Sequence, residues 1–124
     1  MISNLKVDSS GRNISWMHSN LTISKSFKMK VFQVVEIKFL NQILIISDCK
    51  ENGEKNMFIY NENGYCIANP KMPSSEFYGV YSIWYRDNNK LQTVVLLSND
   101  NTSYEKKCEF NLENYVFSNF SETK

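Results

Sequence analysis

The side chains that could carry out chemistry are few in this sequence, and their spacing favours no catalytic site. His18 is the only histidine, and a histidine acting as a general base needs a nucleophile and an orienting partner beside it. Nothing in the sequence nominates either group, so we interpret His18 as an exposed or structural residue. The sequence also contains no phosphate-binding loop, dinucleotide fingerprint or nucleophile elbow. We therefore predict that the chain is not an enzyme.

The cysteines and the acidic loop that begins at Asp48 do not indicate a metal site. Cys49, Cys66 and Cys108 form no closely spaced pair, whereas structural zinc needs four Cys or His ligands. An odd number of cysteines argues against a disulfide framework, and we expect reduced thiols. The loop after Asp48 lacks the ligand order and the closing glutamate of a calcium-binding loop. We expect neither a metal ion nor another cofactor.

Charge and hydropathy argue against two classes of partner. The formal net charge is +1, whereas a nucleic-acid-binding domain usually gathers many Lys and Arg side chains on one face. No apolar run approaches the length of a membrane span, and the N-terminal residues lack the apolar region of a secretory signal. We expect a cytoplasmic protein that contacts neither nucleic acid nor a membrane directly.

The elements that must position any functional side chain are predicted to be β-strands. β-branched and aromatic residues are frequent, and Ala68 is the only alanine, which is typical of an all-β fold. A buried strand, a polar loop, a second strand and a tight Asn-containing turn occupy residues 43–65. The same pattern returns in residues 94–115, and a period of about fifty residues is typical of propeller blades.

We predict one all-β domain over residues 1–124, built from two four-stranded antiparallel meanders and an N-terminal β-hairpin. The hairpin and a connector occupy residues 1–27, the first meander residues 28–70 and the second residues 77–120. Two blades cannot close a propeller ring, so the meanders would form a half-propeller. A β-sandwich is the alternative. The apolar run 28–40 is predicted to be a long, extended or bulged strand.

An aromatic run spans residues 77–85. Strict alternation along a strand sends one set of side chains to one face and a second set to the other. The first set is Phe77, Tyr81, Ile83 and Tyr85, and the second is Tyr78, Val80 and Trp84. Because both faces would be filled, we interpret the run as a strand buried between layers, with Tyr85 at its end able to reach a partner.

The repeat also predicts one recognition surface. In a four-stranded meander, the loops between the second and third strands leave the sheet on the same side as the connector between units. These segments are residues 48–56, 99–103 and 70–76. Loops held by a rigid sheet are common recognition surfaces. The candidate partner-binding residues, most of them acidic, are Asp48, Glu51, Glu54, Glu76, Tyr85, Asp100, Tyr104 and Glu105.

The repeated apolar strand and polar loop, the segment MFIYNENGYCIANP and the second meander resemble small bacterial immunity proteins of contact-dependent growth-inhibition systems. The resemblance covers residues 31–120 and implies a non-catalytic, half-propeller-like cytoplasmic protein. Such a protein binds a cognate toxin domain, often a nuclease or ribonuclease, one to one and covers its active site. Many such sequences carry a tryptophan after the Asn-Gly turn, where this chain has Cys66, Ile67, Ala68 and Asn69.

The resemblance also implies how the two proteins would meet. Carboxylates of the predicted loop surface would face basic residues around the toxin's phosphate-binding cleft, because complementary charge speeds association and sets specificity. The alternative function is a propeller-like binding or scaffold domain that recognises a peptide, a sugar or a phage component.

Overall fold

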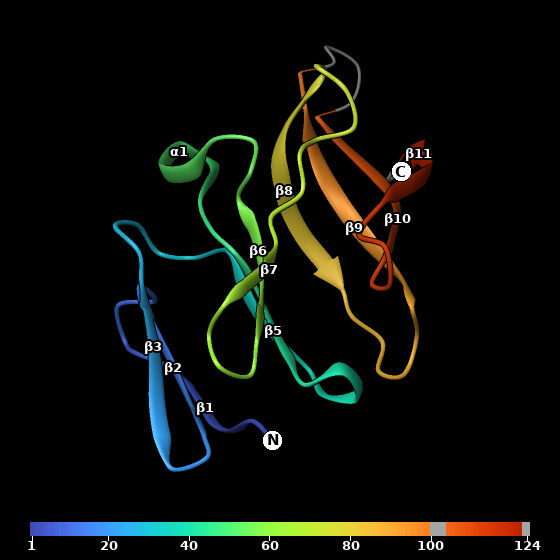
Figure 1. The fold of residues 1–124 in the computed structure, drawn as a ribbon. Coiled ribbons are helices and arrows are strands. Elements are labelled where there is room, and N and C mark those ends of the chain that lie inside the picture. The colour runs from blue at the N-terminus through green and yellow to red at the C-terminus, as the bar shows by residue number, and fades with distance from the viewer. Residues whose placement is uncertain (100–103, 123–124) are drawn as a thin grey trace.

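Three antiparallel β-sheets follow one another along the chain (Figure 1). The structure, a computed structural model, describes residues 1–99 and 104–122. Sheet A contains β1 (Ser3–Val7), β2 (Asn13–His18) and β3 (Leu21–Ser26). Sheet B contains β4 (Gln33–Ile37), β5 (Gln42–Ile46), β6 (Met57–Asn61) and β7 (Cys66–Ala68). Sheet C contains β8 (Phe77–Trp84), β9 (Leu91–Ser98), β10 (Glu105–Asn111) and β11 (Phe117–Glu122).

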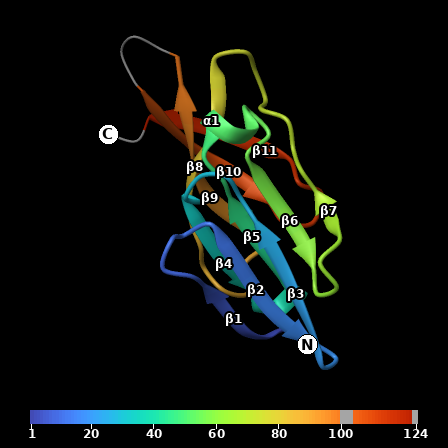
Figure 2. The same ribbon diagram turned by 90° about the vertical axis from the view of Figure 1, so that its left-hand side faces the viewer.

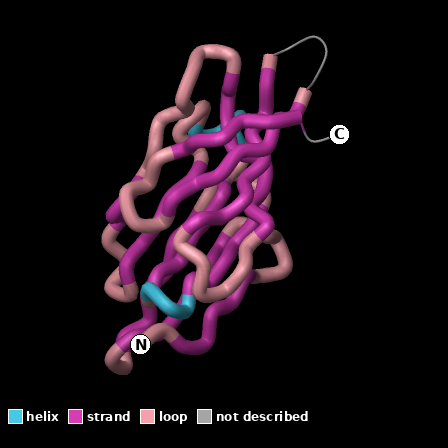
Figure 3. Tube along the Cα trace, turned by 90° about the vertical axis from the view of Figure 1, so that its right-hand side faces the viewer, coloured by secondary structure: helices cyan, strands magenta, loops and turns pink. Residues whose placement is uncertain are grey.

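Within each sheet the strands are neighbours in chain order, so every sheet is an up-and-down meander. Two short helices connect strands of sheet B: the 3-10 helix η1 (Lys38–Leu40) and α1 (Cys49–Asn52). They lie at opposite ends of the strands (Figure 3). The all-β class and the two four-stranded meanders predicted from the sequence are confirmed.

Sheet B is the middle layer of the three (Figures 1 and 2), and β5 is buried on both of its faces. Ile43 and Ile45 belong to a core cluster with Ile14 and Trp16 of sheet A. The alternate residues, Leu44 and Ile46, belong to a second cluster shared with sheet C. All four β5 side chains are 0 % exposed. A continuous apolar run is what a strand covered on both faces requires.

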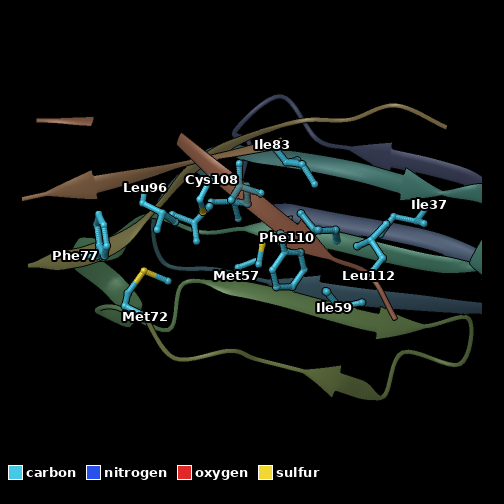
Figure 4. Close-up of a cluster of buried hydrophobic side chains, with 14 residues drawn as sticks. Ile37, Met57, Ile59, Met72, Phe77, Ile83, Leu96, Cys108, Phe110 and Leu112 are labelled. Carbon is cyan, nitrogen blue, oxygen red and sulfur yellow. The ribbon is translucent and has the colours of Figure 1, made fainter. Parts of the chain in front are cut away.

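The larger core lies between sheets B and C. Figure 4 shows side chains of both sheets pointing toward one another, among them Met57 and Ile59 from β6 and Leu96 and Phe110 from sheet C. Phe110 also packs against Phe117, with ring centroids 4.8 Å apart. Burying each such side chain stabilises the fold by about 1.5–3 kcal/mol. Packing between successive meanders therefore holds the layers together.

Each sheet carries the same turn, in which an Asp or Asn side chain bonds the main chain just ahead of it. Asp8 accepts hydrogen bonds from the backbone of Arg12 and Asn13. Asn61 and Asn111 accept from the main chain two to four residues further along their own turns. Asx side chains stabilise turns in this way. The turns at Asn61 and Asn111 each end the third strand of their sheet, in agreement with the sequence repeat, whereas the Asp8 turn follows the first strand of sheet A.

The predicted N-terminal hairpin is formed by β1 and β2. Residues 21–26 extend it by a third strand, β3, in continuous register with β2, so sheet A has three strands. The prediction of one long strand over residues 28–40 was wrong, because only Gln33–Ile37 of that run form a strand. Residues 28–32 are not a strand but a connector between sheets A and B. Their N–H groups bond elsewhere: Lys28 and Met29 donate to the Glu51 carboxylate, and Val31 donates to the Gly11 carbonyl.

Candidate partner-binding surface

Helix α1 and the loop that enters β8 lie at the same end of the sheets (Figure 1). The two segments are in contact. Asp48 begins α1 by accepting a hydrogen bond from Lys50 N, and the Cβ of Cys49 lies 3.0 Å from where a Cβ on Gly79 of β8 would be. The structure thus brings the loop 48–56 against the start of sheet C. Residues 100–103, most of the predicted segment 99–103 of this surface, lie outside the described residues.

Most carboxylates of this end are engaged within the protein. The Asp48 side chain accepts from Lys50 N at 2.9 Å, which satisfies a main-chain donor of the first helical turn. Glu51 accepts from Lys28 N at 3.0 Å and from Met29 N at 2.9 Å. Both carboxylates therefore hold the local backbone, and their oxygens are directed at main-chain N–H groups.

The carboxylate of Glu76 is engaged as well. It accepts from Lys106 Nζ at 2.9 Å and from the buried Ser98 hydroxyl at 3.1 Å. Glu105, the first residue of β10, is half-buried, whereas Glu54 is exposed and forms no ion pair with a described residue. Glu54 is therefore the most available carboxylate among the described candidates.

Two of the three remaining candidate residues, Tyr85 and Tyr104, lie at opposite ends of sheet C. Tyr104 is 73 % exposed and lies at the loop end, where its carbonyl accepts from Ser98 N. Tyr85 follows the other end of β8, packs against the core between sheets B and C, and donates its hydroxyl to Asp87 at 2.8 Å. Burial and this carboxylate raise the pKa of the Tyr85 hydroxyl. Asp100 lies outside the described residues.

An exposed aromatic strip runs along β8, which sequence reasoning missed. The strip consists of Tyr78, Tyr81 and Trp84, whose side chains are 41 %, 47 % and 51 % exposed. The residues directly before each of them, Phe77, Val80 and Ile83, are buried in the core. The interpretation of the whole run as a strand buried between layers is thus wrong, because one face of β8 is open.

The physical reason is a pair of β-bulges. The register between β8 and β9 shifts twice, between Phe77 and Gly79 and between Val80 and Ser82. Each bulge inserts one extra residue, so the two-residue period of a pleated strand becomes three here. One signal was available in the sequence: Gly79 inside the strand, since glycine within a strand often marks a bulge or a close backbone approach.

Two side-chain amides of sheet B fix this strip. Strand β8 is at the edge of its sheet, yet the buried Asn56 pairs with it, Nδ2 donating to Val80 O and Oδ1 accepting from Val80 N, both at 2.7 Å. Gln33 makes the same pair with the N–H and carbonyl of Ile83, both at 2.9 Å. Because main-chain groups between the rings are clamped, the strip is held by a rigid backbone.

A groove separates the connector 28–32 from β8. It has a volume of about 420 Å³ and is lined by Lys30, Val31, Phe32, Asp48, Tyr81 and Ser82. The rings of Phe32 and Tyr81 lie 5.8 Å apart at 59° and form part of its wall. A second hollow of about 370 Å³ is lined by the neighbouring residues Lys28, Met29, Lys50, Glu51 and Asn52. The strip thus continues into a concave, partly charged surface.

His18, the only histidine, lies apart from this surface. Nδ1 of His18 is 3.6 Å from the Glu62 carboxylate, at the sheet A side of the molecule. The cysteines are free thiols, and burial raises the pKa of the Cys108 thiol to about 12. Across residues 1–99 and 104–122, no three His, Cys, Asp or Glu side chains are grouped so as to hold a metal ion.

Comparison of the chain with models of known protein families and with curated proteins finds no match. Within the described part of the chain, neither helix has the length and apolar character needed to cross a membrane.

Proposed function

We propose that this protein binds a partner protein through the aromatic strip on β8 and thereby neutralises it. The observation that carries the proposal is the exposure of Tyr78, Tyr81 and Trp84 on a single clamped strand. Tyrosine and tryptophan are the residues most enriched at the energetic centres of protein interfaces. Three such rings on one strand give another protein a surface to pack against.

Rigidity supports the proposal. Association requires that side chains and backbone be ordered, and ordering each mobile side chain costs about 0.5–1.5 kcal/mol. Aromatic rings have two rotatable angles and lose little freedom on binding. Here the backbone beneath them is also fixed, because Val80 and Ile83 are bonded on both their N–H and their carbonyl groups by Asn56 and Gln33.

The resemblance to immunity proteins of contact-dependent growth-inhibition systems supplies the class of partner: a toxin domain, a nuclease or ribonuclease in many cases. An immunity protein of this kind works by covering the toxin's active site, in a one-to-one complex in the cytoplasm. That mode of action requires a rigid surface and no catalytic residues of its own.

The direct test is co-expression with the product of the neighbouring gene, followed by purification of any complex and an assay of protection from that product's toxicity. The Tyr81→Ala/Trp84→Ala variant should weaken binding by at least about 30-fold, the effect of losing one interface hot spot. Tyr65→Ala is the matched control, since Tyr65 is 71 % exposed in the β6–β7 turn, away from β8. It should bind within about twofold of wild type.

Two results would count against the proposal. If no complex forms and the protein gives no protection, neutralisation is the wrong function. If the complex forms and the double variant binds as well as wild type, the strip is the wrong surface. Thermal unfolding of each variant shows whether the fold is intact. We expect an intact fold, because the substituted side chains are 47 % to 71 % exposed.

A further inference from the structure

Three lysines surround the groove beside the strip. Lys30 lines the groove, and Lys28 and Lys50 line the neighbouring hollow. We call these three residues the basic corner. All three are exposed, and none forms an ion pair with a described residue. The carboxylates of Asp48 and Glu51 are directed at main-chain N–H groups instead. The ammonium groups of Lys28, Lys30 and Lys50 are therefore available to pair with a ligand.

The backbone of the connector that carries two of these lysines is fixed. Phe27 N donates to Arg12 O, Val31 N donates to Gly11 O and Phe32 N donates to Ile46 O, at 2.7–2.9 Å. The stem of Lys30 packs over Gly11, where an added Cβ would lie 2.6 Å from Lys30 Cγ. Since both ends of the connector and its centre are bonded, the lysines project from a preorganised segment.

From this geometry we propose that the basic corner and the groove receive an acidic segment of the partner protein. Carboxylates of that segment pair with Lys28, Lys30 and Lys50, and an apolar side chain of the segment enters the groove against the rings of Phe32 and Tyr81. This inference rests on the proposed function and specifies that the partner's contact segment is acidic with one apolar side chain. It also reverses the sign of the contact that the acidic loop residues suggested from the sequence.

The surroundings favour a peptide over a nucleic acid. Asp48 lines the same groove as Lys30, and it would repel a phosphate backbone that carries a charge at every nucleotide. The groove lining contains no arginine, the residue that pairs with phosphate in a bidentate manner. A peptide can place its few carboxylates at the lysines and a neutral residue beside Asp48.

The proposal can be tested on the isolated full chain by amide NMR titration. The probe is a short synthetic peptide of Asp and Glu around one Phe, and matched peptides replace its acids by Gln or by Lys. We expect saturable shifts confined to residues 28–32, residues 48–50 and Tyr81 with the acidic peptide alone. Raising the salt from about 50 to about 500 mM should weaken binding several-fold, because exposed charges are then screened.

Substitutions sharpen this test. Lys30→Glu/Lys50→Glu should weaken peptide binding by at least about tenfold. The control Lys6→Glu/Lys38→Glu makes the same change of charge at two other exposed lysines and should leave binding within about twofold. Equal binding of the Gln peptide, shifts elsewhere on the molecule, or no shift up to about 5 mM peptide would overturn the inference. Tighter binding of inorganic phosphate or a single-stranded oligonucleotide at the same residues would do so too.

The outcome is separable from that of the proposed function. If Lys30→Glu/Lys50→Glu still neutralises the toxin domain while Tyr81→Ala/Trp84→Ala does not, the strip binds the partner and the acidic-segment inference is wrong. If no toxin is neutralised but the acidic peptide binds as described, the inference about the ligand holds and the proposed function fails.

Discussion

Asn56, directly before β6, and Val80 of β8 are joined by two hydrogen bonds of 2.7 Å. The Asn56 amide donates to the Val80 carbonyl and accepts from the Val80 N–H. It thus makes the two hydrogen bonds that a neighbouring strand would make at this edge of β8. The same Nδ2 also donates to Ser47 O at 2.7 Å. One buried side chain thus links α1's loop, sheet B and sheet C.

Replacing Asn56 by alanine should destabilise the fold strongly. The change leaves Val80 N, Val80 O and Ser47 O without their partner in a buried place, and each unsatisfied group costs about 1–3 kcal/mol. With some relaxation, we expect a loss of about 2–4 kcal/mol in urea unfolding. Asn63→Ala, in the exposed β6–β7 turn, is the control and should change stability by less than about 0.5 kcal/mol. A small effect of Asn56→Ala would contradict the clamp.

Gln33→Leu should act more locally. Leucine retains the volume of Gln33 but removes both hydrogen bonds to Ile83, so the Ile83 amide should lose protection in hydrogen exchange. Amides of β5 should keep their protection, because that strand is bonded on both sides by β4 and β6. Unchanged protection at Ile83 would show that the Gln33 clamp does not form in solution. The same variant should also weaken partner binding if a rigid strip is required.

Asp8 should make stability depend on pH in the acid range. Hydrogen bonds from Asn13 and Ser10 hold the pKa of its carboxyl below the ordinary value of 3.8. Because the folded pKa is depressed, the charged form stabilises the fold above pH 3.8, and this contribution is lost as the pH falls below that value. The Asp8→Asn variant should show a shallower fall of the urea midpoint between about pH 4 and pH 2. An unchanged slope would assign the acid sensitivity to other carboxylates.

The three thiols should react in an order set by burial. Cys66 is exposed, Cys49 is half-buried and Cys108 is buried. Burial raises the pKa of the Cys49 thiol, and it raises that of Cys108 to about 12, so little thiolate forms at either site. A thiol reagent at pH 8 should label Cys66 first, Cys49 more slowly and Cys108 only when the protein unfolds. Mass spectrometry of the labelled peptides reads the order, and early labelling of Cys108 would contradict the packing between sheets B and C.

The sequence predicted correctly what depends on local pattern. The continuous apolar run of β5 indicated a strand buried on both faces, and Ile43 to Ile46 are indeed shared between the two cores. The repeated Asx-type turns at Asn61 and Asn111 marked equivalent ends of two meanders. In each of these cases, residues close together in the chain determine the structure.

What the sequence did not reveal depends on partners far along the chain. Glu51 accepts from backbone groups 22 and 23 residues away, so nothing near it distinguished a structural carboxylate from one that faces solvent. The bulges of β8 could not be predicted for a similar reason. The run from Phe77 to Trp84 has apolar side chains both at a two-residue spacing, as in a regular strand, and at the three-residue spacing of the bulged strand. The bulges accompany a close approach of Gly79 to Cys49 and Asn56, residues more than twenty positions earlier in the chain.

The position of β5 between two cores has a consequence for how the protein unfolds. Ile43 and Ile45 complete one core while Leu44 and Ile46 complete the other, so loss of either outer sheet would expose half of the same strand to water. Neither core can melt alone without weakening its neighbour. The chain should therefore unfold in a single cooperative transition. A fragment that lacks sheet A should expose Ile43 and Ile45 on an apolar surface and self-associate.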